Sequence, residues 1–186
     1  MPILRAFLNF PDEAALIGRM LAGYADLEID LMYCAKAVRA DLDTTLKAMF
    51  IQRGNSQRID IANNLAREPY HELGIGAQFE MAVEAVRYCL QIRNQYAHCT
   101  WWNDNSGQLA LANLEELAKL KVPVTDLHGL TVNHVTVAHL ESQLAYFEYG
   151  DCLLIWVIQE GNARAGRPAF PNRVFPEAVL QPPVFM

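Results

Sequence analysis

The sequence has little positive charge and no long apolar run. Its 186 residues include 15 Lys and Arg against 21 Asp and Glu, for a net charge of −6. Binding nucleic acid without regard to sequence needs a broad basic face, so this balance argues against that class of protein. The longest unbroken apolar run, residues 152–158, has seven residues, whereas a membrane-spanning helix needs about 20. We therefore expect no transmembrane segment.

Signals for export and for disulfide bonding are also lacking. Residues 1–13 contain one Arg and no small-residue cleavage site, so no signal peptide is expected. The cysteines Cys34, Cys89, Cys99 and Cys152 form no Cys-x-x-Cys pair. In a chain of this size without a secretion signal, we expect reduced, mostly buried thiols and a cytoplasmic protein. A disulfide between some pair stays open, although the spacing favours none.

The usual patterns for metals, nucleotides and thiol nucleophiles are absent as well. His134 and His139 are five positions apart, which does not place two imidazoles on one helical face, and no His-Glu-x-x-His occurs. Gly74-x-Gly76 is too short for a glycine-rich phosphate loop. Cys99 points about 100° away from its neighbour His98 on a helix, which argues against a thiolate pair. We expect neither a metal ion nor a cofactor.

Helical periodicity dominates what is there. Hydrophobic residues make up 52% of the chain and charged residues 19%, a composition that supports one domain with a buried core. From Pro11 to about Ala40, apolar residues recur at three- and four-residue steps, the spacing of one buried helical stripe. Pro11 fits the first position of this helix.

A second helical segment is interrupted by turn-forming residues. Asp43 is the expected N-cap of its first part, which Gly54-Asn55 breaks. Ser56 is the expected cap of the continuation, and Pro69 is expected to end it. The pattern therefore predicts a broken second helix rather than one continuous rod.

The second half of the chain contains two longer helices and a hairpin. The third helix should run from about Ala77 to His98, and the last from about Asn133 to Glu160. Between them, the turn-rich residues 103–107 predict a small β-hairpin. Residues 114–124 fit a short helix or a strand. The predicted fold is all-α, an up-and-down bundle of four to five helices with a small β-hairpin insertion between the last two long helices.

Two regions of different composition are expected. Residues 1–160 form the helical domain, with the insertion at about 100–125, and residues 161–186 form a tail. Five of the nine prolines lie in residues 168–183. Such a tail either docks on the body or on a second subunit, or stays partly ordered, and both alternatives remain open.

The most informative stretch, residues 93–98, closes the third predicted helix with the sequence RNQYAH. Asn94 and His98 are four apart and share one face, and the long side chain of Arg93 can reach the rim of the same cleft. An imidazole beside a guanidinium and an amide can move a proton and hold a phosphate. His and Arg also serve as ordinary caps of a helix C-terminus, so the residues alone leave both interpretations open.

The run RNQYAHCTWW resembles the Arg-x4-His signature of the HEPN superfamily (higher eukaryotes and prokaryotes nucleotide-binding domains). In that family the motif ends the third core helix and a polar residue follows the Arg, a place that Asn94 fills here. Residues 25–31, ADLEIDL, resemble the Leu-Glu-x-x-Leu stretch of several HEPN groups. A second helix broken near Gly54 also fits. The resemblance covers about residues 12–160.

The resemblance implies a helical bundle that forms a homodimer and brings two Arg-x4-His motifs into one cleft. It implies a metal-independent endoribonuclease acting on RNA, of the kind found among prokaryotic toxins and defence effectors, in some cases with an antitoxin or other protein partner. The alternative is a non-catalytic HEPN-like module for dimerisation or for binding nucleotide or protein.

The resemblance also assigns roles to individual residues. His98 is the general acid/base, Arg93 stabilises charge on the phosphate, and Asn94 orients the phosphate or the imidazole. Glu28 is the first candidate for an acid that anchors Arg93, and Asp30 is the second. Because the chain is acidic overall, an active cleft has to be locally basic or has to depend on a partner.

Overall fold

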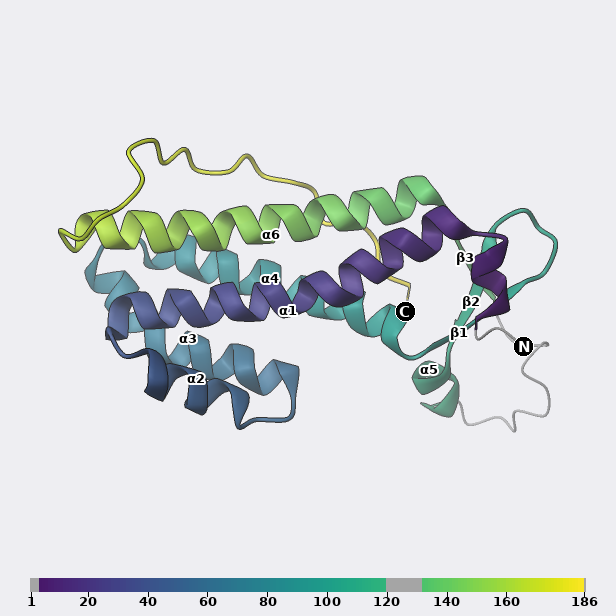
Figure 1. Ribbon diagram of the computed structural model, residues 1–186, viewed down its shortest axis with the longest axis horizontal. Coiled ribbons are helices and arrows are strands. Elements are labelled where there is room, and N and C mark those ends of the chain that lie inside the picture. The colour runs from purple at the N-terminus through teal and green to yellow at the C-terminus, as the bar shows by residue number, and fades with distance from the viewer. Residues whose placement is uncertain (1–3, 120–131, 186) are drawn as a thin grey trace.

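The computed structural model of the chain describes residues 4–119 and 132–185. In this part of the chain, five helices of nine residues or more form an up-and-down bundle, with a small sheet at one end (Figure 1). They are α1 (Pro11–Arg39), α2 (Leu42–Phe50), α3 (Asn55–Glu72), α4 (Gly76–Ala97) and α6 (Val137–Arg164). The structure confirms the predicted mostly helical bundle with a β insertion between its last two long helices.

The starts of α1 and α2 are fixed in different ways, by a proline in α1 and by a capping aspartate in α2. α1 starts with Pro11 at its first position, as predicted. α2 is capped by Asp41 rather than by the predicted Asp43, because Oδ1 of Asp41 accepts a hydrogen bond from the N–H of Thr44 at 3.1 Å. Asp43 lies in the first turn instead, and its carboxylate pairs with Lys47 four residues later at 2.7 Å.

α3 differs from the prediction at both ends. It begins one residue before the expected cap, Ser56, and it does not stop at Pro69 but continues to Glu72. A proline has no N–H to donate to the carbonyl four residues earlier, here that of Leu65. Arg39 of α1 replaces the missing donor, with Nε 2.6 Å from that carbonyl oxygen. This long-range contact allows the helix to continue past the proline.

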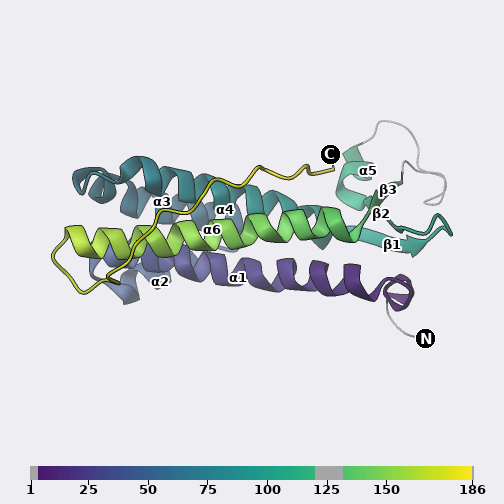
Figure 2. The same cartoon turned by 90° about the horizontal axis from the view of Figure 1, so that it is seen from above.

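The core lies where α1, α3, α4 and α6 run side by side (Figures 1 and 2). Tyr70 of α3 is fully buried there; its hydroxyl donates to the carbonyl of Cys34 at 2.9 Å, and its ring stacks on Phe79 with centroids 4.8 Å apart. α6 approaches this ring at Gly161, where a Cβ would lie 2.7 Å from a ring carbon. A glycine is therefore required for this close packing.

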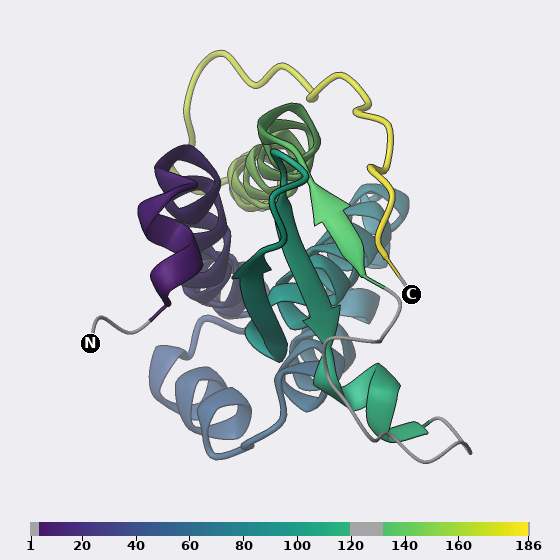
Figure 3. The same ribbon diagram turned by 90° about the vertical axis from the view of Figure 1, so that its right-hand side faces the viewer.

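The sheet lies at the end of the bundle where α4 ends and α6 begins (Figure 3). β1 (Cys99–Asn103) and β2 (Leu109–Asn113) form the predicted hairpin, and β3 (Asn133–Val135) pairs antiparallel with β2. Residues 133–135 were expected in the last helix. They are extended because Thr136 caps α6, with its Oγ1 accepting from the N–H of His139 at 3.3 Å. The ambiguous segment opens with α5 (Leu114–Lys119), and residues 120–124 lie outside the described residues.

The tail after α6 is extended and runs back along that helix (Figure 2). The Nε1–H of Trp156 donates to the carbonyl of Arg173 at 3.4 Å, and the Arg173 guanidinium pairs with Glu160 at 2.9 Å. The described part of the tail therefore docks on the body of the same chain.

The composition predicts no membrane-spanning helix and mostly buried, reduced cysteines. No helix in the described ranges is both long enough and apolar enough to cross a lipid bilayer. The four cysteines are free thiols, of which Cys34 and Cys89 are buried, Cys99 is half-buried and Cys152 is exposed. Burial of the thiols is thus complete at two of the four positions.

Candidate functional site

The C-terminal end of α4 carries the three residues of the predicted site. Arg93 is half-buried and Asn94 is exposed, and Nη1 of Arg93 donates to Oδ1 of Asn94 at 3.2 Å. His98 directly follows the last helical residue as its C-cap and is exposed. The helix end thus joins a guanidinium to an amide and places an imidazole one turn further along.

The chain that leaves α4 fixes this helix end. The carbonyl of His98 accepts a hydrogen bond from the N–H of Leu114 at 3.1 Å, which ties the end of α4 to the start of α5. The thiol of Cys99 donates to the carbonyl of Gln95 at 2.6 Å. That carbonyl is one of those a helix C-terminus leaves without an intrahelical partner. Backbone and thiol together hold the turn that presents His98.

His98 lines a pocket of about 440 Å³, together with Ala97, Cys99, Leu114 and Ala118. Burial raises the pKa of the Cys99 thiol to about 12, so this group stays protonated at neutral pH. Cys99 therefore supplies no thiolate nucleophile, in agreement with its angular separation from His98. Among the described residues that line the pocket, His98 is the one with an imidazole, a side chain that serves as a general acid or base in many enzymes.

Glu28, the first candidate for an acid that anchors Arg93, forms its ion pair with Arg58. It is 4% exposed in α1, and its Oε2 accepts from Nη1 of Arg58 at 2.9 Å. Arg58 is held by its own contacts, since its Nε donates to the carbonyl of Gln52 at 3.1 Å and its guanidinium lies 5.0 Å from the ring centroid of Phe50. Burial raises the pKa of Glu28, and the charges of Arg58 and then Arg93 act against that effect.

Tyr24 lies one turn before Glu28 in α1, and the charges of Glu28, Arg93 and Arg58 act on it. Burial is the largest of the effects that raise its pKa, followed by the charge of Glu28, while Arg93 and Arg58 lower it. Tyr24 Oη and Glu28 Oε1 are buried, and neither has a hydrogen-bond partner among the described residues. We call Tyr24, Glu28, Arg58 and Arg93 the polar centre. The sequence gives no local signal for Arg58, because its partner is 30 positions away.

Asp30 lies on a different face of α1 and is not part of the polar centre. Two helical positions turn a side chain by about 200°, so Asp30 points away from the face that carries Glu28. It faces Asp151 of α6 instead. Burial, a hydrogen bond with Asp151, and the charges of Asp151 and Asp26 raise its pKa to about 7. Asp30, the second candidate for anchoring Arg93, thus has Asp151 as its partner in this structure.

No family model, curated protein or solved structure matches the chain. Within residues 4–119 and 132–185, no three His, Cys, Asp or Glu side chains gather as metal ligands. Nε2 of His134 lies within hydrogen-bond distance of Oδ2 of Asp104, at 2.8 Å.

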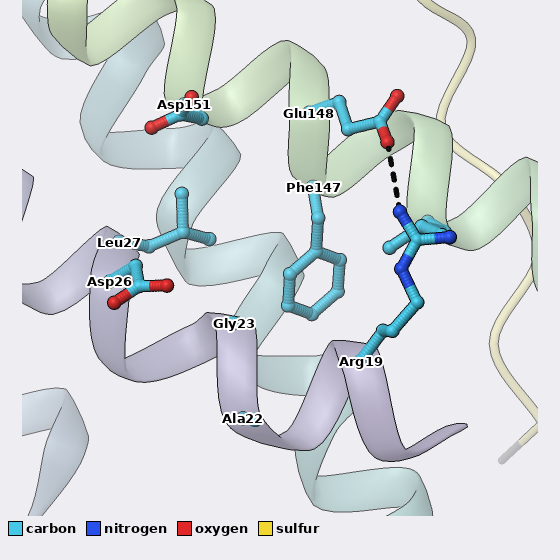
Figure 4. Close-up of a pocket in the computed structure, with 9 residues that line it drawn as sticks. Arg19, Ala22, Gly23, Asp26, Leu27, Phe147, Glu148 and Asp151 are labelled. Carbon is cyan, nitrogen blue, oxygen red and sulfur yellow. Dashed lines mark ion pairs between the residues drawn. The ribbon is translucent and has the colours of Figure 1, made fainter. Parts of the chain in front are cut away.

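A larger pocket, of about 620 Å³, lies in the groove between α1 and α6 (Figure 4). Asp26, Asp151 and Glu148 line it together with Arg19, which pairs with Glu148 at 3.6 Å, and Phe147 points toward α1 between them. Three carboxyl groups against one guanidinium give this groove an electrostatic potential that repels a phosphodiester. The described residues that line the smaller pocket at His98 include no carboxylate.

Proposed function

We propose that the chain is a HEPN-like, metal-independent endoribonuclease that acts as a homodimer, with Arg93, Asn94 and His98 as its catalytic residues. The observation that carries the proposal is the end of α4. There the guanidinium of Arg93 is bonded to Asn94 at 3.2 Å, and exposed His98 lines a pocket beyond it. The resemblance of residues 93–98 to the Arg-x4-His signature adds to this support.

In the proposed reaction, an imidazole accepts the proton of a ribose 2′-hydroxyl and the 2′-oxygen attacks the adjacent phosphorus. The bond to the 5′-oxygen breaks, and that oxygen takes up a proton. The products are a 2′,3′-cyclic phosphate and a 5′-hydroxyl, so the step consumes no water. Because one imidazole does not act as base and acid in the same step, His98 of each copy in the dimer supplies one proton transfer. A positioned acid or base of this kind contributes about 10² to 10⁴ in rate.

Stabilisation of the negative charge on the phosphate is assigned to Arg93. Its guanidinium donates to the non-bridging oxygens as negative charge grows on them, and Asn94 limits the directions in which it can point. Arg58 of the same polar centre pairs with Glu28, and the charge of Arg93 acts on that carboxylate as well, so two guanidiniums act on one carboxylate. This local excess of positive charge supports binding of a phosphate on a chain that is acidic overall.

The test is incubation of the purified protein with total RNA in EDTA. We expect wild-type protein to cut RNA, and both Arg93→Ala and His98→Ala to lose about 10²-fold or more of that activity. Arg19→Ala and His71→Ala are matched controls, because they remove an exposed Arg and an exposed His elsewhere, and they should keep full activity. RNA left intact by a folded wild-type dimer would contradict the proposal.

A second candidate is a non-catalytic HEPN-like module that dimerises, or that binds nucleotide or a protein partner. α2 favours it, since Leu42, Leu46 and Phe50 form an apolar stripe at four-residue spacing, and they are 43%, 44% and 37% exposed. An apolar stripe of this kind is typical of a protein contact surface. Two results together would favour this candidate over the nuclease. The wild-type protein would be a dimer that does not cut RNA, and Leu46→Glu would elute as a monomer in size-exclusion chromatography.

The setting that the resemblance implies is part of the same proposal. The protein acts in the cytoplasm of a prokaryote as a toxin or defence effector, and an antitoxin is the protein partner in the toxin case. Induced expression in a bacterium should slow growth, and Arg93→Ala or His98→Ala should restore it. Equal growth arrest by the wild-type protein and both variants would contradict this role.

A further inference from the structure

Residues 181–185, the C-terminal segment, lie across α4 and α6 near the helix end that carries His98 (Figure 1). Side chains of the bundle bind three backbone groups of this segment: the Pro182 carbonyl accepts from the Tyr88 hydroxyl, the Pro183 carbonyl accepts from Gln143 Nε2 at 2.9 Å, and the Phe185 N–H donates to Gln95 Oε1 at 2.8 Å. The bundle therefore recognises this segment much as a binding site recognises an extended peptide.

Two of the side chains that hold the segment are amides buried in the core. Gln95 is 6% exposed and Gln143 is not exposed at all. Burying an amide without a partner costs free energy, and here the backbone of the segment supplies partners. Pro182 and Pro183 suit the role, because proline favours an extended backbone and has no N–H to leave unpaired.

The segment is connected to the catalytic turn of α4 through two routes. Gln95 lies within residues 93–98 and bonds the segment directly. Tyr96, in the same turn, donates through its hydroxyl to Oε1 of Gln143 at 2.5 Å, and Gln143 bonds the segment in turn. Docking of the segment thus restrains two consecutive residues between Arg93 and His98.

Apolar contacts anchor the same segment. Pro182 is buried, and Val184 and Phe185 pack against the core. The Phe185 ring also lies against the ring of His139 in α6, with centroids 4.9 Å apart. The segment is therefore held by side-chain burial as well as by its backbone hydrogen bonds.

We propose that residues 181–185 are a positioning segment of the site. When docked, they fix the last turn of α4 through Gln95 and Tyr96, and this turn then holds Arg93 and His98 in their working arrangement. When undocked, they leave both buried amides without these partners, and the turn loosens. The catalytic consequence rests on the proposed function, whereas the effect on the helix turn does not depend on it.

The test compares two double variants of the full chain. Val184→Asp with Phe185→Asp places two charges where the segment packs on the core. Val179→Asp with Leu180→Asp places the same charges on an exposed part of the same tail, where Leu180 is 92% exposed. Hydrogen exchange of the backbone amides of residues 93–98 is followed by NMR. We expect exchange about tenfold faster in the first variant and within about twofold of wild type in the second.

Unchanged exchange at residues 93–98 in the first variant would overturn the proposal. If that variant does not fold, Phe185→Ala is compared with Leu180→Ala in the same way, and Phe185→Leu should restore wild-type exchange. RNA cleavage gives a second readout. In the first variant kcat should fall while KM stays within about twofold, because the proposal gives the segment a positioning role and no contact with the substrate. Wild-type protein that leaves RNA intact would refute the nuclease, and the exchange rates would still decide the role of the segment.

Discussion

Nη1 of Arg58 lies 2.9 Å from Oε2 of Glu28, and this ion pair joins the middle of α1 to the first turn of α3. The Glu28 side chain is 6% exposed and that of Arg58 is 21% exposed. Because both charges are largely removed from water, loss of either leaves the other without compensation. The pair therefore stabilises the fold next to Arg93 rather than binding Arg93 itself.

Loss of this pair should be costly and non-additive. Arg58→Ala should lower the free energy of unfolding by about 3 kcal/mol, because Glu28 is left as a buried, unpaired carboxylate. The double variant Glu28→Gln, Arg58→Ala should lose less than the two single variants together. Urea denaturation of all four proteins measures this coupling energy.

The control for the ion pair is Arg67→Ala, which breaks the exposed contact with Glu80 on the surface. Screening by solvent makes such a contact contribute little to stability, so the free energy of unfolding of this variant should stay close to that of the wild type. A coupling energy between Glu28 and Arg58 below about 0.5 kcal/mol would contradict the assigned role of the pair.

Stability should depend on pH through Asp30. Its pKa is raised to about 7 in the folded protein, with burial as the main cause and Asp151 next, whereas an unfolded chain has an Asp pKa of about 3.9. The folded state therefore binds this proton more tightly, and the free energy of unfolding falls as pH rises from about 4 to about 7. Asp30→Asn should remove this pH-dependent loss of stability. At about pH 7.5 it should raise the free energy of unfolding by on the order of 1 kcal/mol, after allowance for solvent screening.

Urea denaturation near pH 5 and pH 7.5 compares the wild-type protein with the variants at this site. Asp151→Asn should give a smaller gain than Asp30→Asn, because burial, the main cause, still acts on Asp30. The double variant should gain about as much as Asp30→Asn alone, since the two changes affect the same group. A pH dependence that is identical in wild type and Asp30→Asn would show that Asp30 is not its source.

Thiol labelling should distinguish the four cysteines. The thiolate is the reactive form, and burial raises the pKa of Cys34, Cys89 and Cys99, while Cys152 is exposed. A short treatment of the folded protein with iodoacetamide near pH 8 should give one adduct, on Cys152, and mass spectrometry of the Cys152→Ser variant should show none. In denaturant all four should react. Rapid labelling of folded Cys99 would contradict the buried thiol beside the site.

The cleavage rate should depend on pH if His98 transfers a proton. An imidazole changes charge near neutral pH, so kcat should bend there as the required protonation state is gained or lost. The measurement is kcat on an RNA substrate in EDTA across the range from about pH 5.5 to 8.5. A flat profile over this range would exclude proton transfer by His98 as the rate-determining event.

The sequence predicts those features that depend on neighbours in the chain. The apolar stripe of α1 repeats every three or four residues, and the polar turn at 103–107 lies between two short apolar runs, so both elements follow from local patterns. The shared helical face of Asn94 and His98 is a prediction from their spacing, and the structure places His98 at the C-cap, one residue past α4.

Contacts between distant segments account for what the sequence does not predict. α3 passes Pro69 because Arg39 bonds the carbonyl of Leu65, 26 positions away. Glu28 pairs with Arg58 of another helix. No periodicity or motif marks such partners, and the role of Glu28 as an anchor for Arg93, which came from the resemblance alone, stays a prediction.

The most direct measurement of the central claim uses an RNA with a single 2′-deoxynucleotide at an identified cleavage site. If the 2′-oxygen is the nucleophile, wild-type protein in EDTA should fail to cut at that position while cutting the all-ribose control there. The fragments from the control should end in a 2′,3′-cyclic phosphate and a 5′-hydroxyl. Cleavage at the deoxynucleotide, or fragments that carry a 5′-phosphate, would contradict the roles assigned to Arg93 and His98.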